Sequence, residues 1–212
     1  MKVLIDADPI VWAVGCVVKD DPLENALHTV KLKLNYIVEQ TGADEHQLYL
    51  TGGNNFRYDI DINYKANRVQ AKPHWFHEIR EYMSSIWGAE IVDGIEADDA
   101  IGLASDPKTS IICSIDKDLD QLPGKHYNYN QDRLYNVTYE EGMHFFYKQM
   151  LMGDRADNIE GIKGIGKVKA EKMLSDLSLD KKMCKVGLEY ACHFDDPEDV
   201  YMKNSKLLWI LR

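Results

Sequence analysis

Residues 109–116 read TSIICSID, the clearest strand pattern in the chain, and the apolar run stops at Asp116. Residues 2–6 (KVLID) show the same pattern near the start, where a short aliphatic run ends at Asp6. Runs of this kind are typical of buried strands. Open α/β sheets build their sites at the carboxyl ends of strands. We therefore expect the two aspartates at the functional edge of a sheet.

Helix and strand patterns alternate around these two strands. Apolar residues at helical spacing predict helices over 23–40, 75–87 and 96–104, and a capping box formed by Thr138 and Glu141 opens a helix that runs to about Met152. Further strands are expected at 47–50, 90–92, 127–129 and 134–137, and the polar segment 52–68 is expected to be loop. This alternation indicates an α/β fold with a mostly parallel central sheet flanked by helices.

The pattern changes from Gly153 onward to short helices and turns that contain glycine. We therefore place an α/β domain at 1–152 and a helical subdomain at 153–212. No linker rich in Pro, Ser or Gly separates them, so the boundary is soft and one compact unit is expected.

The composition is that of a globular protein, with 212 residues, 45% hydrophobic residues and a net charge of −10. No stretch reaches the ~18 apolar residues of a membrane helix, so we expect a soluble cytoplasmic protein without a membrane partner. The cysteines lack CxxC spacing, which argues against a zinc site, and we expect them to be small buried hydrophobic residues. They are Cys16, Cys113, Cys184 and Cys192.

Carboxylates gather at a few points of the sequence. Residues 96–99 (EADD) hold three acids, Asp118 follows Asp116 by two, and Asp154 and Asp157 are three apart. Acids packed this closely repel one another unless divalent cations lie between them, and oxygen ligands suit Mg²⁺ or Mn²⁺. Two such ions about 3.5–4 Å apart form the clamp used for attack on phosphodiesters. Single acids could instead be surface charges or helix caps, but the pattern predicts a metal-dependent phosphoryl-transfer enzyme.

Four motifs occur in order along the chain. They are VLIDAD at 3–8, NYKANR at 63–68, EADD at 96–99 with SIDKDLDQL at 114–122, and GDRADNIEGIKGIGKVKAEKML at 153–174. Together they resemble the 5′-nuclease (flap endonuclease-like, 5′-3′ exonuclease) family, which includes phage 5′-exonucleases and the 5′-nuclease domain of bacterial DNA polymerase I. The resemblance covers nearly the whole chain. It implies a PIN-like α/β nuclease domain and a helical DNA-binding subdomain with a helix–hairpin–helix type turn.

The resemblance also implies roles for matching residues. Lys65 and Arg68 resemble the basic residues that meet the scissile phosphate, and Tyr64 resembles an aromatic on which a terminal base stacks. Alternatively, Lys65 and Arg68 are an ordinary exposed pair. The family's metal-binding acids correspond to Asp6, Glu96, Asp98, Asp99, Asp116, Asp118, Asp154 and Asp157.

Residues 161–167 (GIKGIGK) form the turn of the predicted helix–hairpin–helix element. Its glycines let backbone amides approach phosphates at a helix N-terminus, and its isoleucines are expected to pack the hairpin. Residues 161–172 carry four lysines against one glutamate, a basic patch in an acidic protein. In the family this element grips duplex DNA and often holds K⁺. The predicted DNA contacts here are Lys163, Gly164, Gly166, Lys167 and Lys169.

Two features depart from the family pattern. Thr51 stands where the family usually has another metal-binding aspartate at the end of the second strand, so one metal ion is expected to bind less tightly. Only 27 residues separate Arg68 from Glu96, which is short for the helical arch through which a free 5′ end threads.

The predicted activity is Mg²⁺-dependent hydrolysis of DNA at 5′ ends, flaps or RNA primers during replication or repair, where replication proteins are possible partners. Mn²⁺ is expected to substitute for Mg²⁺. Two alternatives stay open. One is a PIN-like ribonuclease, which leaves the hairpin element unexplained. The other is a catalytically weak protein that binds DNA structures, for which Thr51 is the only sign in the sequence.

Overall fold

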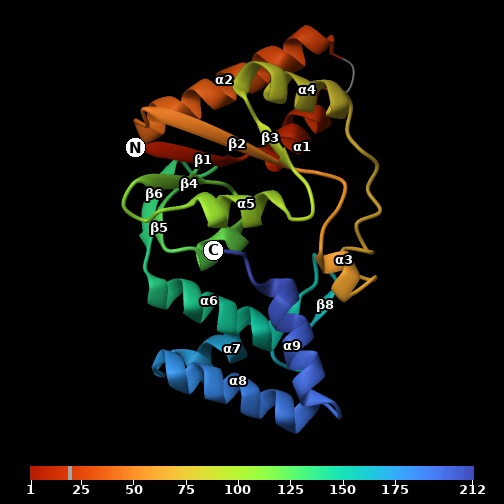
Figure 1. Cartoon of the computed structure of the whole chain (residues 1–212), viewed down its shortest axis with the longest axis vertical. Coiled ribbons are helices and arrows are strands. Elements are labelled where there is room, and N and C mark those ends of the chain that lie inside the picture. The colour runs from red at the N-terminus through yellow and green to blue at the C-terminus, as the bar shows by residue number, and fades with distance from the viewer. Residues whose placement is uncertain (19–20) are drawn as a thin grey trace. The chain divides into compact units, whose positions relative to one another are not determined.

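The computed structural model describes residues 1–18 and 21–212, which form two compact units (Figure 1). Unit 1 comprises Met1–Asn55, Gln70–Val137 and Ile210–Arg212, and unit 2 comprises Phe56–Val69 and Thr138–Trp209. The chain therefore divides at Val137, earlier than the boundary that the sequence suggested after Met152. The last three residues return to unit 1.

Unit 1 is built on one six-stranded sheet of order β3-β2-β1-β4-β5-β6. Neighbouring strands are parallel except β5 and β6, which are antiparallel. This arrangement confirms the predicted mostly parallel α/β sheet. The strands are β1 (Lys2–Asp6), β2 (Glu45–Thr51), β3 (Glu90–Val92), β4 (Ser110–Cys113), β5 (Gly124–Asn128) and β6 (Arg133–Val137).

Alternate residues of the central strands bury opposite faces of the sheet, as the twofold repeat of a strand requires. Val3 and Ile5 of β1 lie in one core cluster with α1 (Asp8–Val17), α2 (Leu23–Thr41) and α4 (Phe76–Trp87). Leu4, between them, lies in a second cluster with α5 (Ala97–Ala104). Figure 1 shows the same layering of unit 1. Helices thus cover both faces of the sheet, so the ends of the strands are the places where a functional site can form.

The α-helices α1 and α3 (Arg57–Ile60) lie where the sequence analysis placed none. Helix α1 begins directly after β1, with Pro9 in its first turn. Its run 10–18 is almost wholly apolar, so no helical periodicity is visible in the sequence. The short α3 lies within the segment expected to be loop.

Unit 2 is helical and is assembled from two separate segments. Its core includes Phe146, Met150, Val186, Tyr190 and Leu207, contributed by three of its helices. The predicted capping box is present, since Glu141 accepts a 2.7 Å hydrogen bond from the Thr138 amide and donates its own amide to the Thr138 hydroxyl. The remaining elements are α6 (Tyr139–Met152), β7 (Gly153–Asp154), β8 (Ile159–Glu160), α7 (Lys167–Leu174), α8 (Leu179–His193) and α9 (Pro197–Leu208).

The cysteines differ from expectation. Cys113 is buried in the sheet, but Cys16, Cys184 and Cys192 are exposed, so the burial expected for them is wrong. All four are free thiols. Within the described residues, none of the helices combines the length and apolar character of a membrane-crossing segment.

Candidate metal centre and nucleic-acid contacts

Asp6 ends β1 as a buried acid, only 3% exposed. Its Oδ2 accepts a 2.8 Å hydrogen bond from the hydroxyl of Ser114. Burial, together with the negative charges of Asp8 and Asp116, raises the pKa of Asp6 from its ordinary 3.8 to about 7. Asp6 thus lies in a buried position of excess negative charge at the carboxyl edge of the sheet.

Ser114 also orders the segment that follows β4. Its Oγ accepts a 2.9 Å hydrogen bond from the amide of Asp116. Oδ1 of Asp116 in turn accepts from the amide of Asp118, 2.9 Å away, and so caps the 3₁₀ helix η1 (Lys117–Gln121). One hydroxyl therefore fixes Asp6 and Asp116 relative to each other. Sequence analysis missed Ser114, although a hydroxyl residue within an apolar strand end is a usable signal.

Thr51 ends β2 and is tied to its neighbours at several atoms. Its amide donates to Oδ2 of Asp8 at 2.8 Å, and its hydroxyl oxygen accepts from the amide of Ala97 at 3.1 Å. Arg80 of α4 donates to the Thr51 carbonyl and to Oδ1 of Asp8, both at 2.7 Å. Arg80 was not expected at this edge, because no local pattern in the sequence links position 80 to position 8.

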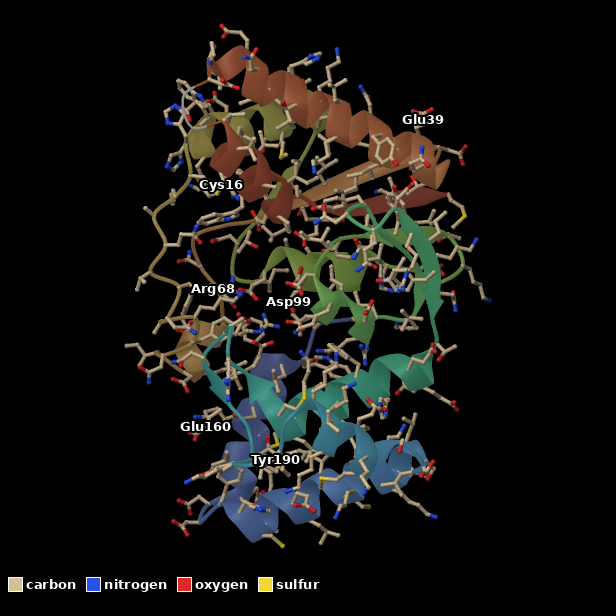
Figure 2. The ribbon with its side chains drawn as sticks, turned by 180° about the vertical axis from the view of Figure 1, so that it is seen from behind. Cys16, Glu39, Arg68, Asp99, Glu160 and Tyr190 are labelled. Atoms are coloured by element: carbon tan, nitrogen blue, oxygen red, sulfur yellow. The ribbon has the colours of Figure 1, made fainter. Side chains whose placement is uncertain are left out.

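The acids of the EADD segment differ in their surroundings. Asp99 is fully buried on α5 (labelled in Figure 2), and its two carboxylate oxygens accept backbone amides of Glu96 and Leu211, each at 3.1 Å. Glu96 and Asp99 form a capping box at the start of α5. These contacts favour a structural role for Asp99, and its predicted role as a metal ligand stays a prediction. Glu96 and Asp98 are half-buried.

The donors of unit 1 fit a hard cation by their chemistry. They are carboxylates at adjacent strand ends, and the raised pKa of Asp6 reflects charge that a divalent ion would neutralise. Among residues 1–18 and 21–212, no three His, Cys, Asp or Glu side chains are already gathered closely enough to hold a metal ion. The fit therefore rests on the kind of donor and on the electrostatics of Asp6.

In unit 2, the Asp157 carboxylate contacts three side chains of the NYKANR motif. Its carboxylate accepts from the hydroxyl of Tyr64 at 3.0 Å, lies 3.7 Å from Nζ of Lys65 and pairs with Arg68. The amide of Lys65 also donates to the Asp157 carbonyl at 2.9 Å. Lys65 adopts a left-handed backbone conformation, with φ of 55°, which favours glycine. The side chain of Arg68, which Figure 2 labels, is half exposed, whereas that of Lys65 is largely covered.

The burial of Tyr64 argues against the predicted stacking role. The residue is 3% exposed and packs in the core of unit 2, with the more exposed Tyr58 edge-on to its ring at 5.8 Å. A ring enclosed in this way offers no face to a base. Asp154, the other predicted metal ligand of unit 2, is half-buried, and its Oδ1 accepts the amide of Ala156 at 2.7 Å.

The predicted hairpin turn lies between β8 and α7. Ile162 and Ile165 are buried in the core of unit 2, as expected, while Lys163, Lys167 and Lys169 are exposed. Gly164 has φ of +80°, a conformation that a side chain would strain, and Gly166 caps the start of α7. The turn therefore presents lysines and a helix N-terminus together, an arrangement suited to phosphate.

Solved structures of known proteins share this fold. The bacteriophage T5 D15 protein, crystallised with metal ions, has a TM-score of 0.77 over 98% of this chain and 88% of its own, at 16% identity. The catalytic core of Rad2 bound to a DNA substrate has a TM-score of 0.56 over all of this chain and 74% of its own, also at 16% identity. The fold is that of the 5′-nucleases.

A sequence relative supports the 5′-nuclease resemblance. A "5′-3′ exonuclease" of Mycoplasmopsis pulmonis is 31% identical over 148 residues, which is 61% of this chain and 50% of that protein. The chain thus spans about half the length of this curated relative. No family model matches the chain. The resemblance to 5′-nucleases expected from the four motifs is confirmed, together with the α/β fold and its helical C-terminal region.

Proposed function

We propose that this chain is a Mg²⁺-dependent 5′-nuclease that hydrolyses phosphodiester bonds of DNA at 5′ ends, flaps or RNA primers. The observation that supports this most is the raised pKa of Asp6. This buried acid lies at the carboxyl edge of the sheet in a 5′-nuclease fold, and burial and two neighbouring acids raise the pKa of its carboxyl. A divalent cation is the partner that this excess charge favours. Mn²⁺ would substitute for Mg²⁺.

The acids of unit 1 would hold the ions. Asp6, Asp116 and Asp118 are ordered by one chain of hydrogen bonds through Ser114. Glu96 and Asp98 begin α5, which the Thr51 hydroxyl contacts at Ala97. Bound ions lower the pKa of coordinated water and stabilise charge on the phosphate. Roles for Asp154 and Asp157 as ligands remain part of the proposal.

The basic residues would neutralise phosphate charge. Arg68 is half exposed and, with Lys65, is held by Asp157 in a fixed geometry, which suits recognition of a phosphodiester. The exposed hairpin lysines and the N-terminus of α7 would bind the duplex backbone, with K⁺ as a further candidate ligand of the turn. A nuclease that removes flaps or RNA primers would act beside replication proteins.

A cleavage assay tests the proposal. The protein is incubated with four labelled substrates, namely a 5′-flap DNA, a recessed 5′ end, an RNA-primed duplex and a single-stranded RNA, each with Mg²⁺ and with EDTA. Cutting of the DNA or primer substrates in Mg²⁺ alone is the expected result. Cutting of the single-stranded RNA alone would point to a ribonuclease, and binding without cutting would point to a structure-binding protein.

A further inference from the structure

Arg80 forms a partly buried ion pair with Asp8 beside the candidate metal acids. Its guanidinium lies 2.7 Å from Oδ1 of Asp8, and the two side chains are 13% and 23% exposed. The Phe76 ring lies 5.4 Å from the guanidinium carbon and supports it. Arg80 also donates to the Thr51 carbonyl, so two hydrogen bonds and a ring fix one positive charge at this corner.

The polar atoms of Thr51 and Asp8 at this corner already have protein partners. Oδ2 of Asp8 accepts the Thr51 amide, and the Thr51 hydroxyl oxygen accepts the amide of Ala97. Thr51, at the end of β2, therefore links the start of α1 and the start of α5. It acts through hydrogen bonds, and its hydroxyl oxygen is directed at an amide hydrogen.

We propose that Arg80 is a fixed cation that closes the Asp8–Thr51 corner to divalent ions, so that unit 1 binds metal through its other acids. A divalent ion bound to Oδ1 of Asp8 would lie close to the guanidinium, and the two positive charges would repel in a partly buried setting. Arg80 thereby supplies permanently one of the two positive charges that an additional divalent ion would bring. This inference rests on the proposed metal-dependent function.

The inference predicts a gain of metal binding. The double variant Thr51→Asp, Arg80→Met removes the fixed cation and adds a carboxylate at the end of β2. It should bind one more Mn²⁺ than the unaltered protein, counted by calorimetric titration and by electron paramagnetic resonance of free Mn²⁺. The matched control Thr51→Asp, Arg80→Lys keeps a cation at position 80 and should show no gain. Melting curves establish that each variant is folded.

A single substitution tests the same corner while Thr51 and Arg80 are kept. Asp8→Asn should leave the number of bound Mn²⁺ ions unchanged, because Asp8 is not a ligand, whereas Asp6→Asn should weaken Mn²⁺ binding at least tenfold. If Asp8→Asn loses an ion, or if the folded double variant gains none, the role of Arg80 is overturned. If the unaltered protein binds no Mn²⁺ at all, the proposed function fails and this inference with it. If the double variant does not fold, Asp8→Asn decides.

Discussion

The hydroxyl of Ser114, just after β4, donates a 2.8 Å hydrogen bond to Oδ2 of Asp6 at the end of β1. This bond joins two adjacent parallel strands at the edge where the sheet carries its acids. It also partly offsets the cost of burying the Asp6 carboxylate, because a hydrogen bond to the charged form lowers its pKa. Burial and the charges of two neighbouring acids raise the pKa by more than this hydrogen bond lowers it.

The first prediction concerns the pH dependence of stability without metal. The pKa of Asp6 is about 7 in the folded state, against 3.8 ordinarily, so between these values the folded state holds a proton that the unfolded state has lost. The Asp6 contribution to the free energy of unfolding should therefore fall as pH rises from about 4 to 7. Urea unfolding in EDTA should therefore show that the free energy of unfolding falls less over this pH range in Asp6→Asn than in the unaltered protein. An identical pH profile for both proteins would contradict the electrostatic argument.

Ser114→Ala tests the bridge between the two strand ends. The substitution removes the donor to Asp6 and the acceptor for the Asp116 amide. Loss of such an outer partner typically weakens metal binding by about 10- to 100-fold, and we expect a change of that size in a Mn²⁺ titration. Ser114→Thr keeps the hydroxyl and is the matched control. Equal Mn²⁺ affinity in the alanine variant and the unaltered protein would remove Ser114 from the site.

The hairpin lysines should set the salt dependence of duplex binding. Replacing Lys163, Lys167 and Lys169 together by alanine should weaken binding and lower the slope of log K against log salt by about one for each phosphate that a lysine no longer neutralises. Fluorescence anisotropy in Ca²⁺ across a salt series measures this slope. The control removes three exposed lysines of unit 1, Lys31, Lys108 and Lys125. A slope that changes only in the control would place the DNA elsewhere.

Asp157 should matter for the stability of unit 2. Its carboxylate contacts Tyr64, Lys65 and Arg68, so Asp157→Asn removes the charge that pairs with two cations. A loss of about 1–3 kcal/mol in the free energy of unfolding is expected. Urea denaturation measures it, with Asp195→Asn as an exposed control of the same chemistry. A loss no larger than that of the control would show that Asp157 does not organise the motif.

The sheet could be predicted from sequence because its strands are short apolar runs that end in polar residues. Asp6 and Asp116 came together at one edge for this reason, and β1 and β4 are neighbours. The roles of individual side chains were harder to predict. Tyr64 is buried and Asp99 caps a helix, and both facts depend on what packs around them in three dimensions.

Contacts between residues far apart in the sequence could not be predicted, for a physical reason. Arg80 meets Asp8 across 72 residues, and nothing in the local pattern of α4 marks position 80 as different from an ordinary surface cation. The same holds for the return of the chain end, where the Leu211 amide donates to Asp99 across 112 residues. Periodicity reports the face a residue occupies, and the partner on that face is set by tertiary packing.

The most direct test compares Asp98→Asn with the unaltered protein on one 5′-flap DNA. Asp98 lies in the EADD segment, half-buried at the start of α5. Cutting is followed under single turnover in Mg²⁺, and binding of the same DNA is measured in Ca²⁺. We predict that Asp98→Asn lowers the cutting rate by at least a hundredfold and changes the DNA dissociation constant by less than about threefold, because loss of negative charge does not weaken attraction to phosphate. Cutting by the variant at the rate of the unaltered protein would contradict a carboxylate-held metal centre in unit 1.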